Sequence, residues 1–509
     1  MKTCKKEKRN GLGVRRAGIL MPVSSLPSEQ GIGTLGKGAY AFVDWLESAG
    51  MKIWQVLPLL PTSYGDSPYQ SFASNALNYY FIDFDELAER GLLEKSDYAE
   101  LDWASDERRV DYGKQFLQKT QVLQKAFAAF DKTDETWQAF LASGQYFDFA
   151  LFTSLKIRFG YKAWDEWDKP FKHAEKAAIE AHVTEYQEEI EFWQFTQFIF
   201  LQQWEKLKAY ANGKGISIMG DMPIYVAYDS VETWLHRKKL FALDRKGNPS
   251  LRAGVPPDAF SEDGQLWGNP VYDWKKMEKD GYSWWKDRIH YAFSLFDILR
   301  IDHFRGFDRF YAISAGAETA KEGKWKSGPK AALFEDMKSY AIVAEDLGII
   351  DDGVRKLMKD TGYPGMKVFE FAFNDDPENE YLPSKYAENC VAYTGTHDND
   401  TLRSFLENMD QNQRRAFEEK LEAECLEADV AYIKETVEDE CESVIRLLMS
   451  SKADTVIVPM HDVLCFGEEA RLNAPSTVSN RNWTFRFTLK DFKNRKAAWL
   501  KSLTEEYQR

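Results

Sequence analysis

The chain has 509 residues, of which 44% are hydrophobic and 29% charged, and these values exclude a disordered or collagen-like protein. Its net charge of −15 at pH 7 disfavours a nucleic-acid or anionic-membrane partner, because the phosphates would be repelled. The length allows either several domains or one large barrel with insertions.

The cysteines and the first residues bear on the cellular compartment. The five cysteines are odd in number and have no CxxC spacing: Cys4, Cys390, Cys425, Cys441 and Cys465. We therefore expect reduced thiols in a cytoplasmic protein, with neither a disulfide framework nor a zinc cage.

Residues 1–16 are basic but precede no apolar segment of signal-peptide type, so we predict a flexible tail. No run approaches the ~18 apolar residues of a membrane helix, which disfavours a membrane protein.

Eight short apolar runs of strand length recur along the chain, with helical patterns between them. They cover residues 17–23, 53–59, 216–221, 298–302, 341–345, 367–373, 391–394 and 455–460. Continuous apolarity indicates strands covered on both faces, as in a parallel sheet beneath helices. Eight such strands predict an α/β fold, a closed (β/α)8 barrel, and the absence of GxGxxG disfavours a doubly wound dinucleotide-binding sheet.

Two connections are too long for simple crossovers and must carry structure of their own. Residues 62–215, after the second strand, are rich in helix formers and predict a mostly helical insertion. Residues 222–296, after the third strand, are rich in Gly, Pro and Trp and predict an ordered, loop-rich cap. We therefore expect residues 17–509 to form a single catalytic barrel domain with two elaborations.

Carboxylates close four of the predicted strands. Asp221, Asp302, Glu345 and Asp398 follow the third, fourth, fifth and seventh strands, and the carboxyl ends of barrel strands form the active site. Arg300 lies two residues before Asp302, so the two side chains share a face of the strand. A guanidinium there would hold Asp302 ionised, as a nucleophile must be.

The other acids predict complementary roles. Glu345 ends an apolar strand, where desolvation favours the protonated form that a general acid needs, and Asp346 beside it is a supporting contact. Asp398 could bind sugar hydroxyls and stabilise positive charge in a sugar ring. Two carboxylates of this kind are the minimum for cleaving a glycosidic bond. Metal ligation and helix capping remain alternative uses of acids at strand ends.

Histidines and aromatic residues gather near the same predicted rim. Three of the seven histidines lie at strand ends, namely His303, His397 and His461. Without HExxH or Cys/His spacing, sugar-hydroxyl contacts explain them better than zinc does. Tyr64 and Tyr69 lie in SYGDSPYQS and Trp267 in LWGNP, where rigid turns would present flat rings to sugars.

Several longer stretches resemble a known family. They are LPSEQGIGTLG (26–36), WQVLPLLPTSYGDSPYQS (54–71), GDMPIYVA (220–227), GVPPDAFSEDGQLWGNP (254–270), RIDHFRGF (300–307), AEDLG (344–348) and TGTHDND (394–400). In this order they are similar to the amylomaltases, the 4-α-glucanotransferases of glycoside hydrolase family 77. The resemblance runs from about Ala17 to the carboxyl end.

The resemblance implies roles for individual residues. Asp302 matches the nucleophile, Glu345 the acid/base and Asp398 the transition-state stabiliser. The positions that match glucan-holding residues are Tyr64, Ser67, Tyr69, Asp221, Gln265, Trp267, Arg300, His303, Asp346 and His397. Residues 254–270 match a mobile loop over the cleft, and Asn473 lies in a second flexible loop. Leu472, Ser476 and the stretch RNWTFRF (481–487) depart from the usual pattern, chiefly where an acceptor would bind.

The implied reaction is transfer of α-1,4-glucan segments to glucose or maltodextrin acceptors by a retaining double displacement. It implies maltooligosaccharide and α-1,4-glucan ligands and no cofactor or metal. Three alternatives stay open. They are a hydrolase or branching enzyme of the α-amylase clan, a glucan-binding protein on an inactive barrel, and a metal-dependent aldolase or isomerase.

Overall fold

The computed structural model describes residues 12–257, 262–348, 350–374, 376 and 379–509. Eight parallel strands form its central sheet, in the order β10-β11-β12-β1-β2-β3-β6-β9. They are β1 (Arg16–Leu20), β2 (Ile53–Gln55), β3 (Ser217–Met222), β6 (Ile298–Ile301), β9 (Ile342–Ala344), β10 (Gly365–Val368), β11 (Cys390–Tyr393) and β12 (Thr455–Pro459). Each overlaps one predicted apolar run, so the predicted barrel is confirmed.

The sheet curls until its two end strands meet. β1 pairs with both β2 and β12, and the backbone N–H of Ala344 in β9 donates to Pro364 O, just before β10, at 2.9 Å. All strands run parallel, so their carboxyl ends open on one rim. This closure brings together side chains that lie hundreds of residues apart in the sequence.

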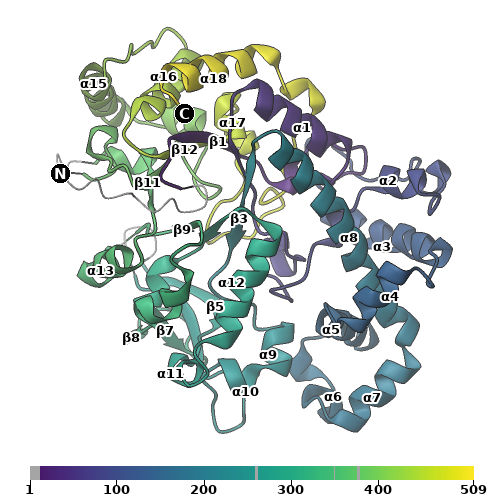
Figure 1. Ribbon diagram of the computed structural model, residues 1–509. Helices are drawn as coiled ribbons and strands as arrows, with labels where there is room; N and C mark the ends of the chain where they lie inside the picture. The colour runs from purple at the N-terminus through teal and green to yellow at the C-terminus, as the bar shows by residue number, and fades with distance from the viewer. Residues whose placement is uncertain (1–11, 258–261, 349, 375, 377–378) are drawn as a thin grey trace, which may run out of the picture.

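Helices surround the barrel (Figure 1). They are α1 (Lys37–Ser48), α8 (Gln187–Gly213), α12 (Ser283–Leu295), α13 (Asp352–Thr361), α14 (Leu402–Glu407), α15 (Gln411–Glu427), α16 (Val437–Ser450), α17 (Met460–Val463) and α18 (Asn494–Glu506). In α13 the Asp351 carboxylate accepts from the N–H groups of Gly353 and Val354, and Gly362 ends the helix at φ 64°. Among the described residues, no helix is both long and apolar enough to cross a bilayer.

The segment between β2 and β3 is helical. It contains α2 (Phe84–Glu89), α3 (Tyr112–Ala129), α4 (Glu135–Ala142), α5 (Phe147–Arg158), α6 (Lys169–Lys172) and α7 (Lys176–Glu185) before α8 returns to the barrel. Figure 1 shows these helices together on one side of the barrel. The fully buried Trp137 packs edge-on against Phe130 and Phe198, which joins α4 to α8.

The segment between β3 and β6 is more regular than the loop-rich cap that we expected. It holds α9 (Val231–Leu235), α10 (Arg237–Leu240), α11 (Trp274–Glu278), β4 (Leu251–Val255), β5 (Gln265–Pro270) and then α12. β4 and β5 form an antiparallel sheet with β7 (Arg309–Ser314) and β8 (Lys324–Ser327), in the order β5-β4-β7-β8. β4 also pairs with β7, which follows β6 in the chain. A pairing between strands so far apart in the sequence leaves no local sequence signal. Trp267 consequently lies in a strand, and its expected placement on a turn is wrong.

Two further boundaries differ from expectation. Arg15, in the predicted flexible tail, donates to the carbonyl oxygens of Ser451 (2.8 Å) and Tyr507 (3.2 Å), and β1 already begins at Arg16. The end of that tail, residues 12–16, is therefore part of the fold. The sixth strand stops at Val368, and Phe369–Ala372 form a 3₁₀ turn where we expected strand up to residue 373.

Candidate active site

A buried ion pair forms the floor of the site. The register of β3 and β6 places Asp221 opposite Arg300, and Nη1 of Arg300 lies 2.7 and 2.8 Å from the two carboxylate oxygens of Asp221. Nη2 of the same guanidinium donates to Oδ1 of Asp302 at 3.1 Å. Arg300 therefore joins the interior of the barrel to the acid that closes β6.

Charged residues of the site affect the pKa of Asp302. Burial raises the pKa of its carboxyl to about 8; Arg300 opposes this rise, while the charges of Glu345, Asp221 and Asp398 add to it. The acids predicted from three other strands therefore lie within electrostatic range of Asp302. Arg300 thus favours the ionised form of Asp302, against the effects of desolvation and of the neighbouring acids.

Glu345 is held by backbone amides. Its two oxygens accept from the N–H groups of His303 (2.6 Å) and Leu347 (2.8 Å). His303 has left-handed backbone geometry (φ 47°), in the turn that brings its N–H to Glu345. Burial raises the pKa of Glu345, although Arg300 and both amides act against the rise.

Asp302 and Glu345 titrate as a pair. Glu345 is buried and Asp302 half-buried, and each carboxyl loses a proton less readily when the other is ionised. We therefore assign one shared proton to the pair near neutral pH. The hydrogen bond from Arg300 favours the negative charge on Asp302 and leaves the proton to Glu345.

Asp398 lies at the open side of the site, and 47% of its side-chain surface is exposed. Its Oδ1 accepts from Nδ2 of Asn473 at 2.6 Å, and its backbone oxygen accepts from Nη2 of Arg471 at 3.2 Å. Arg471 also donates to Asn473 O at 2.9 Å. The loop after β11 and the chain after α17 thus hold Asp398 between them.

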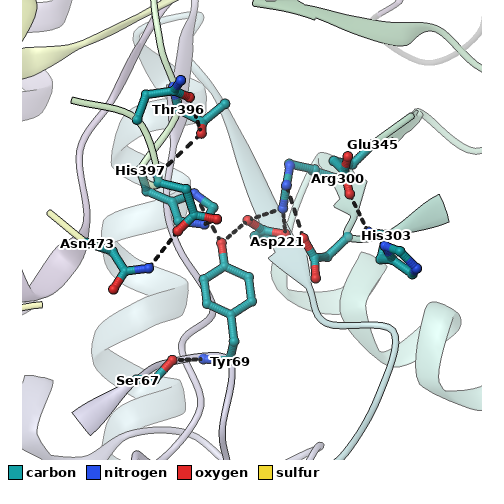
Figure 2. Close-up of polar contacts among 12 residues, drawn as sticks. Ser67, Tyr69, Asp221, Arg300, His303, Glu345, Thr396, His397 and Asn473 are labelled. Carbon is teal, nitrogen blue, oxygen red and sulfur yellow. Dashed lines mark hydrogen bonds and ion pairs between the residues drawn. The ribbon is translucent and has the colours of Figure 1, made fainter. Parts of the chain in front are cut away.

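Aromatic residues line the space between floor and rim. The Tyr69 hydroxyl donates to Oδ2 of Asp221 at 2.7 Å and lies 3.3 Å from Nδ1 of His397 (Figure 2). The rings of Tyr69 and His397 stack at 4.9 Å, and Trp483 lies 5.8 Å from each. Ser67 accepts from the Tyr69 N–H at 3.3 Å, which fixes the turn that carries this tyrosine.

Trp267 packs against His303. Its ring meets His303 edge-on at 4.9 Å, and its Nε1 donates to Oε1 of Gln265 at 3.0 Å. Burial lowers the pKa of His303 to about 3 and also lowers that of His397. Both imidazoles are therefore neutral at pH 7 and act as hydrogen-bonding groups without charge.

Most of the predicted residues converge on this site, with three exceptions. Asp346 is half-buried and accepts from the backbone N–H of Met366 at 2.8 Å, so it ties β9 to β10. His461 is buried beside Asp462. The side chain of Tyr64 and residues 258–261, within the expected mobile loop, lie outside the described residues.

Sequence reasoning missed two contributors, Arg471 and Trp483. Both lie in stretches that we had related to the acceptor side, EEARLNAPS and RNWTFRF, but no periodicity singled them out. Among the described residues, no group of three or more His, Cys, Asp or Glu side chains is placed to hold a metal ion.

The glycoside hydrolase family 77 model, described as 4-alpha-glucanotransferase, matches residues 21–490. The chain belongs to this family. It is 45% identical over 498 residues to the 4-alpha-glucanotransferase of Clostridium butyricum, covering 96% of this chain and 100% of that enzyme. The Thermus thermophilus 4-alpha-glucanotransferase is 40% identical, covering 97% and 99% of the two chains. As a member of family 77, this protein is a 4-alpha-glucanotransferase.

Solved structures agree with this family 77 assignment. An amylomaltase from Streptococcus agalactiae, solved in complex with acarbose, superposes with a TM-score of 0.92 at 40% identity, covering 97% of this chain and 99% of that one. The amylomaltase of Corynebacterium glutamicum has a TM-score of 0.78 at 16% identity, covering 96% and 75% of the two chains, which supports the fold alone.

Proposed function

We propose that this enzyme moves α-1,4-glucan segments to glucose or maltodextrin acceptors by a retaining double displacement, with Asp302 as the nucleophile. The observation that carries the proposal is the difference between the three acids. Asp302 is hydrogen-bonded to a guanidinium, Glu345 is buried against backbone amides, and Asp398 stands at the exposed rim. One nucleophile, one proton donor and one stabiliser are what such a reaction requires.

In the first half-reaction the proton of the carboxyl pair moves to the glycosidic oxygen. Glu345 gives this proton to the leaving sugar while the Asp302 carboxylate attacks the anomeric carbon. The fragment with the free reducing end departs, and a glycosyl ester remains on Asp302. Asp398 accepts hydrogen bonds from sugar hydroxyls, and these bonds strengthen as positive charge develops in the ring.

In the second half-reaction the 4-hydroxyl of an acceptor sugar replaces the departed fragment. Glu345, now ionised, removes the hydroxyl proton, and the oxygen displaces Asp302 from the anomeric carbon. Two inversions restore an α-1,4 bond. The mechanism requires the two carboxyl groups to stand ~5–5.5 Å apart, whereas ~6.5–9.5 Å would fit inversion.

In this proposal the acceptor is a sugar and not water because the site is enclosed. Trp267 and Gln265 on β5 lie over His303, and Asn473 reaches Asp398 from the other side. Enclosure by these groups would exclude water from the ester and align an acceptor ring with it.

The substrate test uses maltotriose alone. Transfer produces glucose and a ladder of longer maltodextrins while the total number of reducing ends stays constant. A steady rise in reducing ends would show hydrolysis and refute transfer. No change in the sugar at all would favour a binding protein.

The covalent step is tested by Asp302→Asn, for which we expect a loss of at least ~10³-fold in rate, because the displacement route is closed. Asp352→Asn, on the exposed first turn of α13, is the matched control and should keep full activity. Mass spectrometry after a fluorinated maltosyl fluoride should find the sugar on the peptide that contains Asp302. Labelling of another carboxylate would refute this assignment.

A further inference from the structure

Two cysteines from different segments meet beneath the rim. Cys441 lies on α16, and Cys465 follows α17, directly after β12. Their sulfur atoms are 3.7 Å apart, in hydrogen-bonding contact. Cys441 is 1% exposed and Cys465 7% exposed, so both are buried and Cys465 is the more accessible of the two. The reaction described above uses neither thiol.

The surroundings shift the pKa values of the two thiols in opposite directions. The hydrogen bond between the two sulfurs lowers the pKa of Cys465 and raises that of Cys441. Arg403 and Lys496 act in the same direction, whereas burial and Glu438 act against it. A thiolate beside a second thiol is the arrangement in which an attacking and a resolving cysteine work together.

Cys465 is also connected to the active site through the chain. The short segment after it forms a 3₁₀ turn at Glu468–Ala470 and continues into Arg471 and Asn473. These two side chains hold Asp398, by its backbone oxygen and its carboxylate respectively. A shift of Cys465 would therefore be transmitted to Asp398 over fewer than ten residues of chain.

We propose that Cys441 and Cys465 are a peroxide-sensitive disulfide site whose oxidation displaces the 465–473 segment and lowers the transfer rate. The Cys465 thiolate attacks the peroxide, forming a sulfenic acid and, after protonation, one water. The Cys441 sulfur then attacks the sulfenic sulfur, forming the S–S bond and releasing a second water. Two thiols and one hydrogen peroxide thus give one disulfide and two waters.

The geometry indicates which side moves. A disulfide bond is about 2.05 Å long, so the sulfurs must approach by roughly 1.7 Å. Cys441 is fixed in α16, whose neighbouring residues Val444 and Ile445 are fully buried. Cys465 lies outside regular structure with left-handed backbone geometry (φ 54°), so the loop side absorbs the movement. The predicted effect on rate rests on the proposed role of Asp398, whereas the cross-link itself does not.

The test treats the full-length enzyme with hydrogen peroxide and maps its peptides without reduction. We expect a peptide pair joined through Cys441 and Cys465, two thiols fewer in denaturant, and reversal by dithiothreitol. Persistence of all five thiols, or oxygen added to Cys465 with no cross-link, would overturn the proposal. This readout is independent of activity, so it separates the disulfide from the proposed reaction.

Cysteine variants test the coupling to turnover. Oxidised wild-type enzyme should transfer three- to tenfold more slowly than reduced enzyme, and dithiothreitol should restore the rate. Cys441→Ser and Cys465→Ser should keep their rates at the same peroxide dose, whereas Cys425→Ser, buried to the same extent as Cys441, should respond like wild type. A cross-linked enzyme with an unchanged rate would refute the coupling.

Discussion

Replacing Arg300 by Met tests the charge arrangement on which the site depends. Methionine has a similar length and no charge, so the change removes the guanidinium and largely preserves packing. In the native protein this group bonds Asp221 at 2.7 and 2.8 Å and Asp302 at 3.1 Å. The Asp221 side chain is fully buried, so the variant leaves a buried carboxylate without its cation.

Two magnitudes follow from this geometry. Removing one partner of a buried ion pair costs about 3–5 kcal/mol, so the free energy of unfolding should fall by that amount. Losing an adjacent opposite charge raises a carboxyl pKa by about 1–3 units. In the proposed mechanism Asp302 must be ionised to attack, so moving the shared proton from Glu345 to Asp302 should lower the active fraction at pH 7 by up to about a thousandfold.

Urea denaturation and initial transfer rates on maltotriose measure the two effects separately. The double variant Asp221→Asn/Arg300→Met removes the uncompensated carboxylate, so it should recover much of the stability while activity stays low. Arg309→Met is the matched control, because that exposed arginine pairs with Asp351 at the surface, where an ion pair contributes about 0–1 kcal/mol. Unchanged stability in Arg300→Met, or recovered activity in the double variant, would refute the reasoning.

Three further predictions concern the proton, the rim and the packing. Asp302 and Glu345 titrate together, with the pKa raised to about 8 at Asp302. In the proposed mechanism Glu345 needs the proton that the pair shares, so transfer should decline as pH rises through about 8, and a kcat/KM profile with no alkaline limb there would contradict this. Asn473→Ala should lower kcat/KM by about ten- to a hundredfold, since one hydrogen bond to a carboxylate contributes about 1.5–3 kcal/mol. An unchanged value would show that the bond has no part in turnover. Gly365→Ala places a methyl carbon 2.4 Å from Oδ2 of Asp346, so it should lower the free energy of unfolding, measured in urea, by about 1–3 kcal/mol. An unaltered urea midpoint would show that the Asp346 carboxylate moves aside freely.

The barrel was predictable because its signal is local. Each strand is a short apolar run, and the carboxylates that close the strands follow from the same pattern. Period-two alternation correctly placed Arg300 and Asp302 on one face, and the observed hydrogen bond joins them. The strand register then adds Asp221, which pairs with Arg300 across β3 and β6.

What the sequence did not predict depends on distant contacts. The small sheet requires β4 to pair with β7, on the far side of a barrel strand. Arg471 and Trp483 reach the site only because the chain after β12 folds back over the rim. The pKa of Asp302 likewise depends on burial, which raises it, and on the charge of Arg300, which lowers it. The extent of burial depends on the folded structure and cannot be predicted from residue spacing.

The floor of the site (Asp221 and Arg300) is built from strands, whereas the rim (Asp398) is held by loops. This difference bears on which properties can vary among family 77 enzymes. Asp221 and Arg300 lie on paired strands, so a change there alters the surroundings of Asp302, the proposed nucleophile. Asp398 is held by Asn473 and Arg471, which lie outside strands and helices and next to the departures at Leu472 and Ser476. Substitutions in that segment change how Asp398 is presented while leaving Asp302 and its guanidinium in place. Acceptor preference should therefore diverge among relatives through the 471–487 segment, with the displacement chemistry unchanged.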